Sequence, residues 1–142
     1  MSQQLIDCII KAEGVEQFAY EDSLGFITIG CGRCIDKKRG KGLSREESLY
    51  LLNNDIKDCK LKLSPYPFYQ ELDPVRKEVL AELCFNLGIG GLLGFKRMIA
   101  AIQSKDFIAA SLELLDSKWA TQIQRSRRTS IAYRLKYGIY PT

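Results

Sequence analysis

The fold is decided by the stretch EGVEQFAYEDSLGFITIG, residues 13–30, because the spacing of its apolar residues changes within it. Upstream, apolar residues recur at helical spacing, which predicts a helix over residues 3–13 with Gly14 as its C-cap. From Phe18 to Cys31 the period becomes two, which predicts a β-hairpin. Gly25 suits the left-handed position of a three-residue hairpin loop at 23–25. The sequence therefore predicts a helix followed directly by a hairpin.

The register of this hairpin predicts which side chains share a face. With the loop placed at 23–25, Asp22 pairs with Phe26 and Tyr20 pairs with Thr28. Because side chains alternate along a strand, Tyr20, Asp22 and Thr28 then lie on one face of the hairpin.

Glu13, Asp22 and Thr28 have the chemistry required to cleave a glycosidic bond. Such cleavage requires a protonated carboxyl near the leaving oxygen and a second group that manages charge or water on the opposite side. The end of a helix disfavours negative charge, so Glu13 suits the acid, while Asp22 stays ionised and Thr28 holds water. The alternatives are a solvated glutamate, an aspartate that caps turn amides, and an ordinary strand threonine.

The composition indicates one globular domain over residues 1–142, with 46% hydrophobic and 27% charged residues and a net charge of +4. This mild positive charge favours anionic partners without choosing between nucleic acid, acidic membrane and cell-wall polymer. No apolar run approaches the roughly 20 residues of a membrane span, and the amino terminus lacks the pattern of a signal peptide. We therefore expect neither membrane insertion nor a leader.

The chain has five cysteines and no histidine, which excludes imidazole-containing zinc sites. We expect no metal and no cofactor, and we expect the thiols to be reduced and to act as small buried or half-buried hydrophobes. Cys31 and Cys34 have the C-x-x-C redox spacing, but no helix pattern begins there, so their role stays open.

The remainder of the chain is predicted to be helical. Ser44 and Glu47 form a capping box that opens a helix through about residue 63, and Asp73-Pro74 opens another through about residue 87. Shorter helices are expected near 92–103, 106–115 and 125–136. The predicted fold class is α+β, mainly α, with a small antiparallel hairpin lobe at 1–43, a connecting helix at 44–63 and a helical lobe at 64–142.

The spacing of Glu13, Asp22 and Thr28, followed by Ile-Gly-Cys-Gly at 29–32, resembles the phage-type lysozymes, glycoside hydrolase family 24. The resemblance covers nearly the whole chain in order. Its further segments are Ser44–Asp55, Leu72-Asp73-Pro74-Val75-Arg76, Phe85-Asn86-Leu87-Gly88, Gly94-Phe95 and Trp119.

The resemblance implies a lysozyme-like fold and a muramidase. Such an enzyme hydrolyses the β-1,4 bond between N-acetylmuramic acid and N-acetylglucosamine, with inversion. Glu13 would be the general acid, and Asp22 would position or activate water with Thr28 alongside. Inversion predicts a separation of roughly 6.5–9.5 Å between the Glu13 and Asp22 carboxyls.

The resemblance also implies substrate contacts and partners. Tyr20, Gly32, Phe85 and Asn86 match positions that line the cleft between lobes, although Phe85 also suits a core and Asn86 a helix cap. Arg125, rather than Arg128, is our choice for the arginine that approaches Glu13. The partner would be peptidoglycan glycan strands, cut by a monomeric endolysin that waits in the bacterial host cytoplasm until a holin releases it to the wall or periplasm.

The chain departs from the family pattern between residues 33 and 44. The usual loop histidine is Arg33 here, which we expect to pair with Asp55, and the loop is shorter than in the T-even phage enzyme. Four cations in this loop suit either an acidic wall polymer or a solvated surface: Lys37, Lys38, Arg39 and Lys41.

Three other functions remain open. A lytic transglycosylase needs the acid without a water-activating partner. A nucleic-acid-binding protein would use the Arg125–Arg128 helix and the Lys37–Lys41 loop, but the net charge of only +4 and the lack of a nucleic-acid-binding motif argue against it, so we expect no nucleic-acid partner. A wall-binding or baseplate module would keep the fold and lose turnover.

Overall fold

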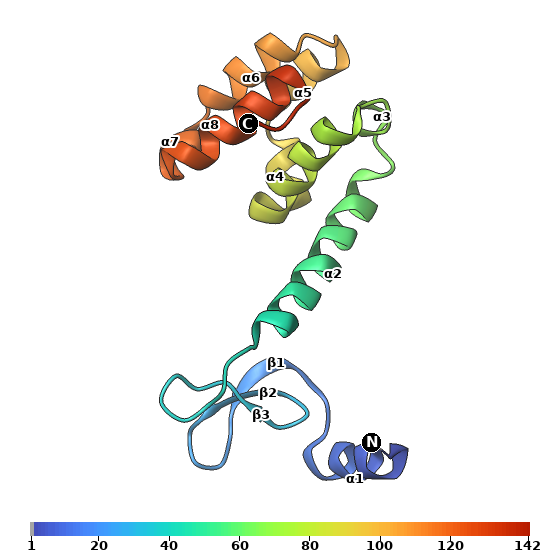
Figure 1. The fold of residues 1–142 in the computed structure, drawn as a ribbon, viewed down its shortest axis with the longest axis vertical. Helices are drawn as coiled ribbons and strands as arrows, with labels where there is room; N and C mark the ends of the chain where they lie inside the picture. The colour runs from blue at the N-terminus through green and yellow to red at the C-terminus, as the bar shows by residue number, and fades with distance from the viewer. Residues whose placement is uncertain (1) are drawn as a thin grey trace. The chain divides into compact units, whose positions relative to one another are not determined.

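A computed structural model describes residues 2–142 of the chain. It divides into two compact units, residues up to 51 and residues 52–142, and the boundary falls inside helix α2 (Arg45–Leu63). Among the described residues, three short strands form one antiparallel sheet and the other elements are helices (Figure 1). The prediction of a mainly helical α+β fold is confirmed.

The first unit begins with helix α1 (Gln3–Glu13), which has the bounds that the apolar spacing predicts. The Ser2 hydroxyl accepts a hydrogen bond from the Leu5 backbone N–H at the start of the helix. At its end, Gly14 has a φ of 74° and donates its N–H to the Ile10 carbonyl. The glycine cap therefore stops the helix directly after Glu13.

The sheet of this unit runs in the order β1 (Glu16–Glu21), β2 (Ile27–Gly30) and β3 (Arg33–Cys34). Tyr20 lies opposite Thr28, and the Asp22 N–H donates to the Phe26 carbonyl, so the predicted hairpin register is confirmed. Gly25 has a φ of 83° in the loop, as the turn requires. Sequence periodicity does not predict β3, because two residues are too few to show alternation.

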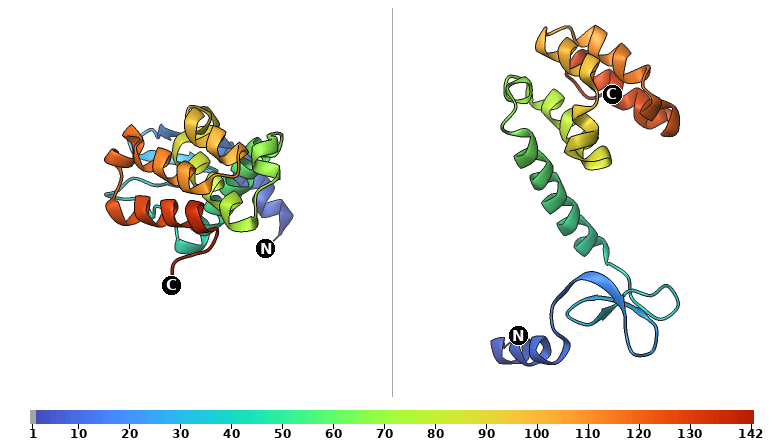
Figure 2. Two further views of the ribbon diagram at one scale, coloured as in Figure 1. Left: turned by 90° about the horizontal axis from the view of Figure 1, so that it is seen from above. Right: turned by 180° about the vertical axis from the view of Figure 1, so that it is seen from behind.

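The second unit is helical. After the second half of α2 it contains α3 (Pro67–Gln70), α4 (Pro74–Leu93), α5 (Lys96–Gln103), α6 (Phe107–Leu115), α7 (Lys118–Gln122) and α8 (Arg125–Tyr137). Helices α6 and α8 pack side by side, as both views of Figure 2 show. The core consists of fully buried apolar side chains, among them Leu63, Leu80, Leu83, Leu92, Met98, Leu114, Ile131 and Leu135. Gly88, with a φ of 75°, interrupts α4 directly after the predicted end at residue 87.

Arg76 connects the start of α4 to the end of α8. Its Nε donates to the Leu135 carbonyl at 2.7 Å and its Nη2 to the Lys136 carbonyl at 2.8 Å. Its Nη1 pairs with Asp73 Oδ1 at 2.9 Å, and the guanidinium lies 3.7 Å from the centroid of the Phe107 ring. One half-buried cation thus satisfies carbonyls that the end of α8 leaves without helical partners.

No single helix among residues 2–142 is long and apolar enough to cross a membrane. Only α4 and α5 taken together reach that length and composition, and they are bent by 96° at their junction.

Candidate active site

Glu13 is the last residue of α1, and its carboxyl group lies against the turn between β2 and β3. A Cβ atom built on Gly32 would come within 2.8 Å of both Cδ and Oε2 of Glu13. Gly32 also has a φ of 76°, a conformation that favours glycine. The glycine therefore lets the carboxyl group approach the sheet, a contact that the sequence did not predict, and the role of Gly32 in binding substrate stays a prediction.

Asp22 is half-buried at the end of the β1–β2 hairpin. Its Oδ1 accepts hydrogen bonds from the backbone N–H groups of Leu24 and Phe26, both at 2.9 Å. The turn-capping alternative for this aspartate is thus confirmed. Among the described residues Oδ2 has no hydrogen-bond partner, so one oxygen is held by the turn while the other remains available to water or substrate.

Thr28 occupies the central strand, opposite Tyr20 on β1 and Cys34 on β3. Its side chain is 4% exposed, and its Oγ1 donates to the Phe26 carbonyl at 3.1 Å. Tyr20 is half-buried beside it. Given this register, Tyr20, Asp22 and Thr28 lie on one face of the hairpin, as predicted.

Arg33, which we expected to pair with Asp55, pairs with Glu47 in the first turn of α2, at 2.7 Å. The same carboxylate accepts the Ser44 N–H at 3.1 Å, and the Glu47 N–H donates to the Ser44 hydroxyl, which confirms the capping box. These hydrogen bonds from Ser44, followed by those from Arg33, hold the pKa of the Glu47 carboxyl below its ordinary value of 4.5. Arg33 thereby connects the start of β3 to the first turn of α2.

Phe85 and Asn86 lie on α4 in the second unit. The Phe85 side chain is 45% exposed, so it is not a core residue. Asn86 Oδ1 accepts a hydrogen bond from Trp119 Nε1 at 2.7 Å. Its amide NH₂ remains available for a sugar, and the contact with substrate stays a prediction for both residues.

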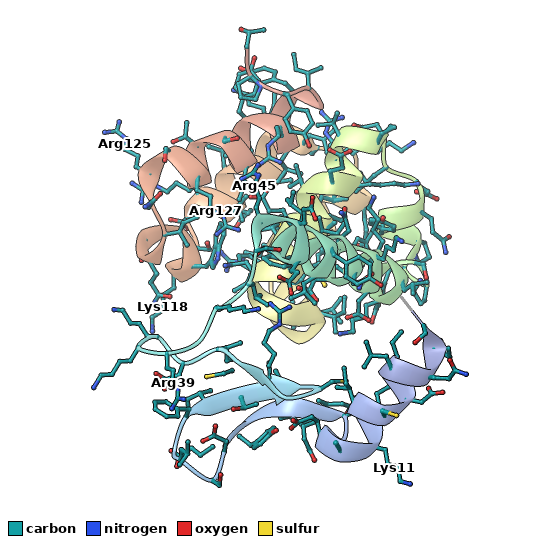
Figure 3. The ribbon with its side chains drawn as sticks, turned by 60° about the horizontal axis from the view of Figure 1, so that its bottom comes forward. Lys11, Arg39, Arg45, Lys118, Arg125 and Arg127 are labelled. Carbon is teal, nitrogen blue, oxygen red and sulfur yellow. The ribbon has the colours of Figure 1, made fainter. Side chains whose placement is uncertain are left out.

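The arginines at the start of α8 have different partners. Arg127 Nε pairs with Glu82 at 3.4 Å, and Arg128 Nη1 donates to the Ala120 carbonyl at 2.9 Å. Arg125 is exposed and extends outward from the first turn of α8 (Figure 3). Of the three it is the one without a hydrogen bond or ion pair among residues 2–142. Its approach to Glu13 stays a prediction.

The second unit also contains a cavity of about 520 Å³ that the sequence did not predict. Its charged lining comes from Lys60 on α2, Glu78 and Glu82 on α4, and Arg127 and Arg134 on α8. Glu82 bridges both arginines, and its contact with the buried Arg134 is 2.7 Å long. The sequence does contain a pattern that indicates this cluster of charges. Glu78 and Glu82 are four residues apart on one helix, and Arg127 and Arg134 are seven apart on another, so each pair lies on one face of its helix.

The cysteines are all free thiols, but only part of their prediction is correct. Cys59 and Cys84 are buried and Cys34 is half-buried, whereas Cys8 and Cys31 are exposed. Burial, followed by a hydrogen bond with the Cys59 thiol, raises the pKa of the Cys84 thiol to about 11. The Cys84 thiol is therefore protonated and unreactive at neutral pH. Residues 2–142 contain no cluster of three or more histidine, cysteine or acidic side chains that could hold a metal ion.

The first unit thus offers two carboxyl groups and a hydroxyl on adjoining elements. One carboxyl ends a helix and lies against a glycine, and the other is oriented by two backbone amides. This arrangement suits acid catalysis at one oxygen combined with charge stabilisation or water binding nearby.

Comparison with known proteins concerns the chain as a whole. The sequence profile described as "Phage lysozyme" matches residues 10–133. Two relatives from Dictyostelium discoideum, probable T4-type lysozymes 2 and 1, are 28% and 25% identical to the chain, and each alignment covers 90% of this chain and 92% of the relative. The pre-baseplate central spike protein of Enterobacteria phage T4 is 22% identical over 85% of this chain, which spans only 26% of that longer protein.

Proposed function

The chain belongs to the phage lysozyme family, and we propose that it hydrolyses the β-1,4 bond between N-acetylmuramic acid and N-acetylglucosamine in peptidoglycan, with inversion. The proposal assigns general acid catalysis to Glu13, which donates a proton to the leaving oxygen. Asp22 orients the attacking water and stabilises positive charge on the sugar, and Thr28 lies beside that water.

The observation that supports this proposal most directly is that the turn binds one carboxylate oxygen of Asp22 and leaves the other without a partner among residues 2–142. Two backbone amides hold Oδ1 at 2.9 Å, so the carboxylate does not need to reorganise when a sugar binds. Oδ2 has no hydrogen-bond partner among residues 2–142, so it is available to a water molecule. A carboxylate that backbone amides have already oriented suits the activation of water.

Product analysis distinguishes this function from a transglycosylase. Purified peptidoglycan digested by the wild type should yield reducing ends, identified by mass spectrometry, and Asp22→Asn should lower their rate of formation. Anhydro ends formed at equal rates by the wild type and Asp22→Asn would instead support the transglycosylase, because that reaction needs no attacking water.

The stereochemical course can be followed separately. Proton NMR of the first products formed should show the α-anomer from the β-linked substrate, because water attacks from the side opposite the leaving group. Initial release of the β-anomer would contradict inversion.

The setting of the reaction is also proposed. A role in lysis of a bacterial host, action as a monomer, and release from the cytoplasm through a holin stay predictions that accompany the muramidase. Salt-dependent retention on DNA without any activity on walls would instead support the nucleic-acid-binding alternative.

A further inference from the structure

The basic loop between β3 and α2 is tightly folded. The Gly40 N–H donates to the Asp36 carbonyl at 2.6 Å, and the Lys41 N–H donates to the Cys34 carbonyl at 3.1 Å. A Cβ atom on Gly40 would lie 2.5 Å from both Asp36 N and Cys34 O. Only glycine therefore fits at the point where the loop closes. Asp36 Oδ1 accepts the Lys38 N–H at 2.9 Å. The positions of the loop's cations are therefore set by backbone contacts.

Arg39 stacks on the hairpin that carries Asp22. Its guanidinium carbon lies 4.9 Å from the centroid of the Phe26 ring, and Phe26 is one of the two residues whose N–H groups donate to Asp22 Oδ1 (Arg39 is labelled in Figure 3). Within residues 2–142 the guanidinium of Arg39 makes no hydrogen bond or ion pair. Stacking fixes its plane while leaving five N–H donors free, which is the arrangement that binds a carboxylate with two parallel hydrogen bonds.

A small cavity joins this loop to the turn that contacts Glu13. Its volume is about 260 Å³, and its lining consists of Gly32, Arg33, Cys34, Arg39, Gly40 and Lys41. Arg33 is already paired with Glu47, whereas Lys41 is exposed and, like Arg39, forms no ion pair in the described part of the chain. Two unpaired cations thus share a cavity with the glycine that lies against the general acid.

We infer that Arg39 and Lys41 form a binding site for the carboxylate groups of the stem peptides of peptidoglycan. This inference rests on the proposed function. The muramic acid residue at the scissile bond carries the stem peptide on its lactyl group, so peptide carboxylates lie close to the bond being cut. Gly32 both lines the cationic cavity and contacts Glu13, so the cavity lies where it can bind such a group. Teichoic-type polymers are attached elsewhere on the glycan and are not held at that position.

The test compares two substrates prepared from one sample of purified peptidoglycan that has been freed of secondary wall polymers. One retains its carboxylates, and the other has them converted to amides. The quantity measured is the ratio of kcat/KM for the carboxylate substrate to kcat/KM for the amidated substrate. The double variant Arg39→Gln with Lys41→Gln should lower this ratio by roughly tenfold, because it loses charge-assisted hydrogen bonds. The control is Lys37→Gln with Lys38→Gln, which removes the same charge from the same loop outside the cavity.

Arg39→Lys tests the geometry separately from the charge. Because an ammonium cannot make two parallel hydrogen bonds from a fixed plane, this variant should lower the ratio by several-fold although the net charge is unchanged. A ratio equal to that of the wild type in Arg39→Lys and in the double variant would overturn the inference. An equal fall in the Lys37/Lys38 control would overturn it too, because that result assigns the effect to overall charge.

A binding measurement keeps this test separate from catalysis. Sedimentation with insoluble walls in the Glu13→Gln background should show weaker binding after amidation, and the Arg39/Lys41 double variant should abolish that difference. If the walls are never hydrolysed but this pattern holds, the proposed function fails and the carboxylate site stands. If hydrolysis occurs and binding ignores amidation, only the carboxylate site fails.

Discussion

The carboxyl group of Glu13 lies so close to Gly32 that a Cβ atom at residue 32 would come within 2.8 Å of Cδ and Oε2. The end of α1 and the turn between β2 and β3 therefore meet at this contact. We expect residue 32 to act as a positioning residue for Glu13.

Gly32→Ala should displace the acid. The methyl group has no space unless the Glu13 carboxyl moves, and misplacement of a catalytic group by about 1 Å can lower activity by roughly 100-fold. Gly30→Ala is the matched control, since Gly30 has a similar φ of 68° and nothing within 4 Å of an added Cβ. Both variants carry about 1–2 kcal/mol of backbone strain. Equal kcat/KM values for the two variants would contradict the positioning role.

Glu47→Gln should change the dependence of stability on acid pH. Because its pKa is lowered in the folded state, the Glu47 carboxylate stabilises the fold above the ordinary value of 4.5, and this contribution is lost as the pH falls through the folded-state pKa. Urea unfolding should therefore show the wild type more stable than Glu47→Gln at pH 7, with a smaller difference near pH 3. Glu46→Gln, without hydrogen-bond partners among residues 2–142, is the control, and a difference for Glu47→Gln that does not vary with pH would contradict the assignment.

Arg76→Lys should destabilise the helical unit although it keeps the charge. The lysine cannot reach Leu135, Lys136 and Asp73 together, and carbonyls left without donors cost roughly 1–3 kcal/mol each. We expect a loss of roughly 2–4 kcal/mol in urea unfolding. Arg97→Lys makes the same substitution at an exposed arginine. Equal stabilities for the two variants would show that the connection between α4 and α8 contributes little.

Asn86→Ala should change the fluorescence of Trp119, which is the only tryptophan in the sequence. The substitution removes the acceptor 2.7 Å from the indole N–H, which should shift the emission and cost roughly 1–3 kcal/mol of stability. Asn53→Ala on α2 is a control that lacks such a bond within the described residues. An unchanged emission maximum in Asn86→Ala would contradict the hydrogen bond.

Sequence patterns predicted the elements that local chemistry determines. The bounds of α1 follow from its apolar spacing and the Gly14 cap, and the register of Tyr20 with Thr28 follows from the loop at 23–25. The capping box between Ser44 and Glu47 followed in the same way. These features depend on residues at most eight positions apart, so the sequence holds the necessary information.

Features that depend on distant contacts were not predicted. Strand β3 and helices α3 and α7 are too short to show periodicity, and the approach of Gly32 to Glu13 requires the folded sheet. Arg33 forms an ion pair with Glu47 because the loop after β3 returns to the start of α2. The stacking of Arg39 on Phe26 depends in turn on the loop closure at Gly40, which composition describes only as a run of charges.

In the proposed reaction Glu13 donates the proton that breaks the glycosidic bond. The most direct measurement is kcat/KM for hydrolysis of purified peptidoglycan by the wild type, Glu13→Gln and the control Glu16→Gln. We expect a loss of roughly 10²–10⁴-fold for Glu13→Gln and little change for Glu16→Gln, because the amide keeps the shape of the side chain but cannot act as an acid. Wild-type turnover by Glu13→Gln would contradict it.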